Sequence, residues 1–205
     1  MSTIKHEAFV NLYNKNQNIF DELFKETKTL KDLTKKISKL SLTYKQLAYS
    51  EKEGSNKVKG DLFEIFAECF LNIFSAHPRI GVYDYRPGPA VDDYGVDGYG
   101  VGMDNNPCTV QVKFRQNITS ELVLDDIKNF EGFSYRNYKV PVDTTTNLIF
   151  FTNAKGLNFI TEAKVLSGAS RTIGNKLIRE LVDNNNVFWK EVLEMVELTI
   201  KEKYN

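Results

Sequence analysis

An acidic residue and a polar pair stand close together in the middle of the sequence, in the segment DDYGVDGYGVGMDNNPCTVQVKFRQN. Asp97 lies in a glycine-rich turn, and Gln111 and Lys113 follow one residue apart within an otherwise apolar run. Hydrolysis of a phosphodiester at neutral pH needs a metal that polarises the phosphate, a group that produces or orients hydroxide, and a cation for the developing charge. A carboxylate, an amide oxygen and an ammonium group suit these roles.

The ligands offered here are hard oxygen atoms, which Mg²⁺ and Mn²⁺ prefer in proteins. Asp97 offers a carboxylate, Gln111 an amide oxygen, and the backbone carbonyl of Val112 lies between Gln111 and Lys113. Lys113 can reach the attacking water, and Glu64, from an earlier apolar segment, can complete the ligand set. The expected metal ligands are Glu64, Asp97, Gln111 and Val112. The expected catalytic residues are Glu64, Asp97, Gln111 and Lys113.

A β-hairpin from Gly95 to Arg115 is expected to position the central groups. The segment MDNNPC is a strong turn signal between its two strands. Alternation in CTVQVKFRQ places the apolar side chains on one face of the second strand and Gln111, Lys113 and Arg115 on the other. Asp97 lies near the start of the first strand.

An apolar helix is expected to carry the remaining acid. The segment GDLFEIFAECFLNIF is apolar on nearly all sides, which indicates a well-buried helix. Glu64 and Glu68 interrupt it four residues apart, on one face. A buried carboxylate is costly unless it is paired or binds a metal. Glu64 is therefore a candidate metal ligand, with a partly exposed helix edge and an internal ion pair as the alternatives.

The rest of the chain indicates a mixed α/β fold. Residues 1 to about 50 carry apolar residues at helical spacing. Strands are expected at IGVYDYRP and at Leu148 to Phe151, and helices at SELVLDDIKNFEGFSYRNYK and GLNFITEAKVLSG. One or two more helices follow from Asn175 to Lys203, with a break near Asn184 to Asn186. A mixed sheet with helices on both faces fits this order.

Two groups of positive residues lie outside the Asp97 hairpin. Lysines recur on the polar side of residues 25 to 45, where they could form a solvated helix face or contact phosphates. Ser167, Arg171 and Lys176 lie near a turn in SGASRTIGNKLIREL, where they could bind phosphate or cap a helix. Both alternatives stay open in each case.

Composition and charge limit the possible classes of function. The 205 residues include 27 Lys and Arg and 27 Asp and Glu, so no overall field identifies a partner. Cys69 and Cys108 both lie in apolar runs, as expected of buried thiols in a reducing compartment. The N-terminus has no apolar signal-peptide region, and no run approaches the roughly 18 apolar residues of a membrane span, so we expect a cytoplasmic, non-membrane protein. Two histidines exclude a His-rich zinc site, and there is no P-loop or dinucleotide-binding motif.

The motif GVDGYG…VQVKFR resembles that of the PD-(D/E)XK nuclease superfamily in its Asp…Gln-x-Lys form, familiar from Mrr-like restriction endonucleases. GDLFEIF stands where that family has a helix with a Gly-x-x-Phe-Glu pattern. LIFFTNAKGLNFITEAKV is similar to the family's strand, Thr-Asn turn and helix. The resemblance covers roughly residues 58 to 183. It implies a restriction-endonuclease-like α/β (α+β) fold, with Asp97, Gln111 and Lys113 as the core triad and Glu64 as the added helix acid.

The chain departs from the family pattern in two places. Val96 stands where the full motif has a proline, a departure common in the family. Gln111 removes one negative charge from the metal site, which weakens metal binding unless Glu64 compensates. Asp92 and Asp93 are rival acids, and Asp93, four residues before Asp97, ranks below it.

The resemblance implies a Mg²⁺- or Mn²⁺-dependent endonuclease acting on double-stranded DNA, of restriction, homing or mobile-element type. We expect a helical extension at residues 1–54 and a nuclease domain at residues 55–205. One metal site cuts one strand, so we expect a homodimer, with the helices of about residues 18 to 41 as the contact or DNA clamp. The alternative is a nuclease-fold protein with weak or lost catalysis that binds nucleic acid or acts in assembly.

Overall fold

The computed structural model describes residues 2–48, 54–89, 95–127, 129–142, 146–158 and 170–204. The helices are α1 (Glu7–Lys15), α2 (Ile19–Phe24), α3 (Leu30–Ala48), α4 (Gly54–Ile73), the 3₁₀ turn η1 (Leu124–Asp126), α5 (Phe130–Tyr138), α7 (Asn175–Val182) and α8 (Asn186–Tyr204). The strands are β1 (Val82–Pro87), β2 (Gly98–Gly102), β3 (Pro107–Lys113), β4 (Leu148–Thr152) and β5 (Ser170–Ile173). Within these ranges, no helix combines the length and apolar character needed to cross a membrane.

The five strands form one mixed sheet in the order β1-β2-β3-β4-β5. The first three strands are antiparallel neighbours, and β4 and β5 run parallel to β3 and to each other. The expected hairpin is confirmed as β2 and β3, in which Gly98 pairs with Val110. The expected mixed sheet with flanking helices is also confirmed. The carboxyl ends of β3 and β4 lie side by side, with Lys113 beside Thr152.

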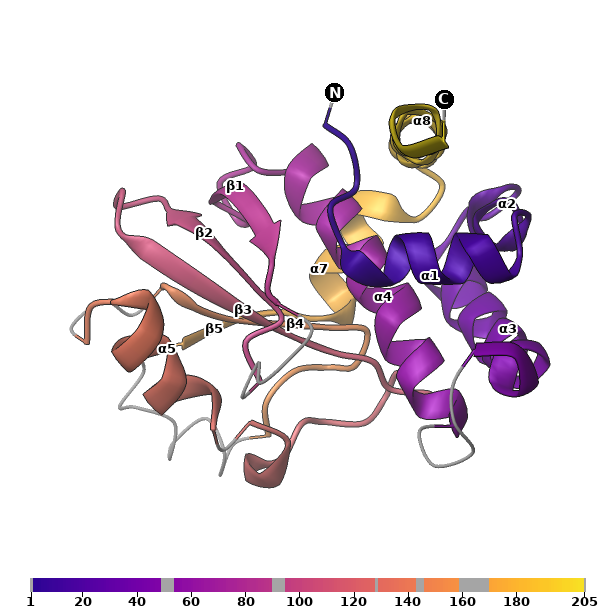
Figure 1. Cartoon of the computed structure of the whole chain (residues 1–205). Coiled ribbons are helices and arrows are strands. Elements are labelled where there is room, and N and C mark those ends of the chain that lie inside the picture. Colours follow the sequence, from indigo (N-terminus) through magenta and orange to yellow (C-terminus); the bar gives the residue numbers. More distant parts are fainter. Residues whose placement is uncertain are drawn as a thin grey trace.

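Helix α4 lies between the sheet and the N-terminal helices, while α5 covers the opposite face of the sheet (Figure 1). The larger apolar core joins α4 to one sheet face through side chains such as Phe63, Phe66 and Phe151. A smaller core lies under α5 and includes Phe130 and Phe150, whose ring centroids are 5.0 Å apart. Both faces of the central strands are therefore covered.

The N-terminal helices bury their apolar stripe within the chain itself. Phe20, Leu23, Leu33 and Ile37 belong to the same core as α4, the sheet, α7 and α8. The stripe that suggested a contact between subunits is thus covered by the chain's own core, and the exposed side chains described on α3 are polar except for Leu42. The division at residue 54 remains a prediction, because the packing joins both sides of it.

Two elements differ from what the sequence pattern suggested. The helix expected from Ser120 is replaced at its beginning by η1, and α5 starts only at Phe130. The Asp126 carboxylate accepts from the Val123 N–H at 2.9 Å, which caps the short turn η1 at its beginning. Strand β5 was not expected, because its four residues show no strand pattern. Its pairing with β4 makes this segment a strand. The helix expected at GLNFITEAKVLSG lies almost wholly outside the described residues.

Candidate metal and active site

A cavity of about 210 Å³ lies where the N-terminal segment, α4 and the connection between β1 and β2 meet. Its acidic lining consists of Glu7, Asp61, Glu64 and Asp97. His6 and Lys57 are the basic or titratable nitrogen groups in the same lining. Two of the residues expected from the sequence, Glu64 and Asp97, are thus brought into one cavity.

Asp97 lies just before the first residue of β2 and is hydrogen-bonded to the backbone of β3. Its N–H donates to the Val110 carbonyl at 3.0 Å, and its Oδ2 accepts from the Val112 N–H at 2.6 Å. The N–H and C=O of one strand residue point to the same side, so the Val112 carbonyl faces the Asp97 edge of the strand. A carboxylate and a backbone carbonyl therefore lie next to each other, as two ligands of one cation would.

Glycines make this approach possible. A Cβ at Gly98 would collide with the ring of Tyr85, and a Cβ at Gly88 would lie 2.7 Å from the Val96 carbonyl oxygen. The Gly88 N–H also donates to the Asp97 carbonyl at 2.9 Å. The two glycines allow the end of β1 and the start of β2 to close around Asp97.

Gln111 is buried, with 2% of its surface exposed, and its Oε1 has no hydrogen-bond partner among the described residues. Its neighbour on the same strand face, Thr109, donates to the Ser134 hydroxyl of α5 at 2.8 Å. Gln111 therefore faces α5, and its amide packs so closely against Gly95 that a Cβ there would collide with it. It does not line the cavity that holds Asp97. A buried amide oxygen without a donor is free to accept a further ligand.

Lys113 is the last residue of β3 and lies on the same strand face as Gln111. The turn after β4 fixes its backbone, since the Thr152 hydroxyl donates to the Lys113 carbonyl at 2.7 Å. Asn153 holds the next residues by accepting from the Arg115 N–H at 2.6 Å and donating to the Arg115 carbonyl at 2.7 Å. The Thr-Asn turn thus positions the end of the motif strand.

Glu64 forms an ion pair with His6, whose Nε2 lies 2.8 Å from the Glu64 Oε2. Burial lowers the pKa of His6, but the hydrogen bond and charge of Glu64, with the charges of Asp61 and Glu68, outweigh it and raise that pKa above its ordinary value. The internal ion pair considered from the sequence is therefore present. Any cation held by Glu64 must share this carboxylate with the imidazole or displace it.

Glu68, the second acid of α4, has a structural partner. It is fully buried, and its two oxygens accept from the N–H groups of Lys5 at 2.7 Å and His6 at 3.0 Å. Burial raises the pKa of Glu68 despite these two donors. The carboxylate fastens the N-terminal segment onto α4, which brings His6 to the cavity.

The oxygen donors fit a divalent cation that retains several waters. Mg²⁺ is commonly held by one or two carboxylates, with waters and substrate phosphate completing its shell. Asp97, Glu64 and the Val112 carbonyl offer that set, and the unpartnered Gln111 oxygen lies on the same strand. Across the described parts of the chain, no three His, Cys, Asp or Glu side chains are already grouped as a metal site.

Two lining residues were missed from the sequence. Asp61 is 4% exposed, and its Oδ1 lies 3.2 Å from the Lys57 Nζ. Its position three residues before Glu64, on one side of a helix, was a usable signal. His6 gave no such signal, because it is 58 residues from its partner. The rival acids Asp92 and Asp93 lie outside the described residues.

Comparison with known proteins does not assign a family. No protein-family model matches the chain, and no curated protein gives a significant match. A functional assignment therefore rests on the fold and on the geometry of the cavity.

Proposed function

We propose that the chain is a metal-dependent DNA endonuclease with a restriction-endonuclease-like fold of the PD-(D/E)XK, Mrr-like type. One observation carries the proposal. The carboxylate of Asp97 is bonded to the backbone of the strand that bears Gln111 and Lys113, and it shares a cavity with Glu64. An Asp, a Gln-x-Lys strand and a helix acid are the parts that the sequence motif requires.

The residues have distinct roles in this proposal. Asp97 and the Val112 carbonyl would hold Mg²⁺ or Mn²⁺, with Glu64 as the second carboxylate. The Gln111 amide would join them as a neutral oxygen ligand after its side chain turns from the α5 face toward the cavity. When bound, such a cation polarises the phosphate and lowers the pKa of a water. Lys113 orients the attacking water and stabilises the negative charge that develops on the phosphate.

In this proposal, Lys113 reaches the Asp97 cavity by extending round the end of β3. Its side chain starts on the α5 face, whereas the cavity opens on the α4 face. Because Lys113 is the last residue of β3, its flexible four-carbon stem can bring the ammonium group round the strand end toward Asp97. The same strand end adjoins the carboxyl end of β4, and clefts at such strand ends are common ligand sites in parallel α/β sheets.

A second function has specific support. His6 occupies the Glu64 carboxylate, and Gln111 is buried away from the cavity. Both features suit a nuclease-fold protein that binds nucleic acid or acts in assembly with weak or lost catalysis. This function retains the fold but predicts no metal-dependent cleavage.

The proposed substrate is double-stranded DNA, and the proposed assembly is a homodimer. The exposed lysines of α3 could contact DNA, but the apolar stripe of α2 and α3 is already buried. A dimer would therefore form through another surface. Static light scattering of the protein alone and with a duplex measures this directly.

A supercoiled-plasmid assay separates the two functions. The wild type, Asp97→Asn and a control variant, Asp84→Asn, are each incubated with plasmid in Mg²⁺ and in EDTA. Asp84 is an exposed acid on β1 that does not line the cavity. We expect nicked and linear products from the wild type and the control in Mg²⁺ only. A gel shift without cleavage by the wild type would favour the binding function.

A further inference from the structure

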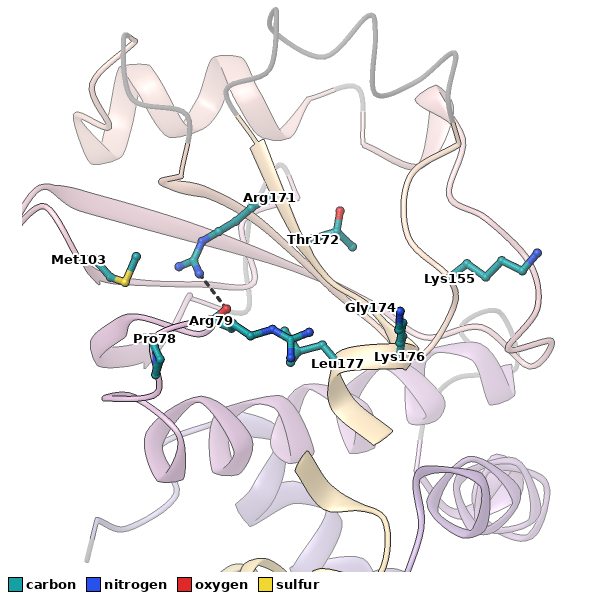
Figure 2. A pocket seen from close by; sticks show the side chains of 9 residues that line it. All are labelled: Pro78, Arg79, Met103, Lys155, Arg171, Thr172, Gly174, Lys176 and Leu177. Atoms are coloured by element: carbon teal, nitrogen blue, oxygen red, sulfur yellow. Dashed lines mark hydrogen bonds between the residues drawn. The ribbon is translucent and has the colours of Figure 1, made fainter. Parts of the chain in front are cut away.

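A second hollow, of about 450 Å³, runs from β5 to the beginning of α7 (Figure 2). Arg79, Lys155, Arg171 and Lys176 contribute to its lining, and none of its nine described lining residues is acidic or aromatic. Neither this hollow nor its cations form part of the Asp97 cavity. A cluster of like charges in one hollow is unfavourable for the free protein and favours an anionic ligand.

Arg171 is the most firmly held of these cations. Its guanidinium donates to the carbonyl oxygens of Thr146 at 2.8 Å and of Arg79 and Gly81 at 3.3 Å each. These partners are backbone dipoles, so they orient the guanidinium without neutralising its charge. Burial lowers the pKa of Arg171, although an arginine remains cationic at neutral pH. A fixed positive charge therefore stands at one end of the hollow.

Arg79 contributes less charge than Arg171. Its Nη1 lies 2.7 Å from the Glu180 Oε1, and both side chains are about half exposed. This carboxylate partly balances Arg79 before any ligand arrives.

Lys155 and Lys176 are exposed and come from two elements that are locked together. The Asn175 N–H donates to the Ala154 carbonyl at 2.8 Å. A Cβ at Gly174 would lie 2.6 Å from the Lys155 carbonyl oxygen, so only glycine allows α7 to begin this close to the end of β4. Neither ammonium group has a carboxylate partner in the described parts of the chain. In the first turn of α7, the N–H groups of Lys176 and Leu177 lack intrahelical acceptors and add donors at the same place.

We propose that this hollow binds the phosphodiester backbone of a nucleic acid. The cations are spread along it, with Arg171 and Arg79 at one end, Lys176 near the middle and Lys155 at the other end (Figure 2). That spread suits successive phosphates better than a single anion, and a mononucleotide would find no aromatic ring for its base. Lysine and arginine contact phosphates without reading sequence. That the ligand is a nucleic acid rests on the proposed function. The hollow would hold the DNA substrate at a second place, away from the Asp97 cavity.

The test is fluorescence anisotropy with a labelled DNA duplex in EDTA, where no cleavage can occur, at several salt concentrations. The double variant Lys155→Ala/Lys176→Ala is compared with the wild type and with Lys201→Ala/Lys203→Ala, which removes two exposed charges from the last turn of α8. Loss of two phosphate contacts should weaken binding roughly 2- to 30-fold. It should also make the plot of log K against log salt concentration shallower by about 2. The α8 control should retain the wild-type affinity and slope.

The inference is overturned by no binding of duplex at low salt, by unchanged affinity and slope in the Lys155/Lys176 variant, or by equal losses in the α8 control. Competition by ATP at the hollow with no effect of the variant on duplex binding would also overturn it, in favour of a nucleotide site. The plasmid assay keeps this test separate from the proposed function. Cleavage with unchanged duplex binding in the variant rejects only the hollow, whereas variant-sensitive binding without cleavage rejects only the nuclease.

Discussion

Replacing Gln111 with leucine tests whether this residue is kept for function at the expense of stability. The Gln111 Oε1 is buried without a partner, and an unsatisfied buried acceptor costs about 1–3 kcal/mol. Leucine is similar in size and has no polar atom to satisfy. After allowing for lost contacts of the amide nitrogen, we expect Gln111→Leu to raise the free energy of unfolding by about 1 kcal/mol. For a chain of this length, that raises Tm by about 2–4 °C.

Thr109→Val is the matched control for Gln111→Leu. Thr109 is buried on the same face of β3, but its hydroxyl donates to Ser134 at 2.8 Å. Replacing it removes a satisfied hydrogen bond worth about 0.5–1.5 kcal/mol, so Tm should fall. The two polar-to-apolar substitutions, two residues apart, should thus change Tm in opposite directions.

Urea unfolding and thermal melts, with and without Mg²⁺, measure both variants. Mg²⁺ should stabilise the wild type and Thr109→Val, because a ligand that binds only the folded state raises stability by mass action. It should stabilise Gln111→Leu less, and that variant should lose cleavage. The reasoning is refuted if Gln111→Leu is destabilised as much as Thr109→Val, or if it keeps wild-type activity.

Three further predictions concern Glu68, Lys113 and Asp126. Glu68→Ala leaves two backbone N–H groups of the N-terminal segment without acceptors and should cost about 2–4 kcal/mol by urea unfolding; an unchanged midpoint would show that the segment is held by other contacts. Lys113→Ala should slow single-turnover cleavage by roughly 10²–10³ while DNA affinity in Ca²⁺ stays the same, and a parallel loss of affinity would make Lys113 a phosphate-binding residue instead. Burial raises the pKa of Asp126, but its bonds to Val123 and Arg115 outweigh this and hold that pKa below its ordinary value of 3.8. Asp126→Asn should therefore cost about 0.5–1 kcal/mol near neutral pH. The difference should begin to shrink as the pH falls below 3.8 and disappear as it passes through the lower pKa of the folded state, where the wild-type carboxylate also becomes protonated.

Local sequence signals were sufficient for the hairpin and for the buried strand β4. The MDNNPC turn and the alternation around Val110 place β2 and β3 correctly, and the apolar run from Leu148 is buried at every position. The apolar surround of Glu64 correctly indicated a buried helix whose acid needs a partner. Turn residues, alternation and helical spacing act over a few residues, so they can be recognised without knowledge of the tertiary structure.

The features that the sequence did not predict depend on contacts between residues far apart in the chain. The partner of Glu64 is His6, which lies in the N-terminal segment that Glu68 fastens to α4. The polar face of β3 was expected to line a site, but Gln111 is covered by α5, since central strands with helices on both faces are buried on both sides. The strand character of Arg171 and its neighbours depends on pairing with β4. None of these contacts leaves a periodic pattern in the sequence.

The central claim is that Asp97 holds the divalent cation that supports DNA cleavage. The most direct measurement is the single-turnover rate of duplex cleavage as a function of Mg²⁺ concentration, for the wild type and for Asp97→Asn. We predict a wild-type rate that rises from zero and saturates with Mg²⁺, and an Asp97→Asn rate that stays at background although the variant melts within a few degrees of the wild type. Equal rates for the two proteins, or wild-type cleavage that persists without a divalent cation, would contradict the account.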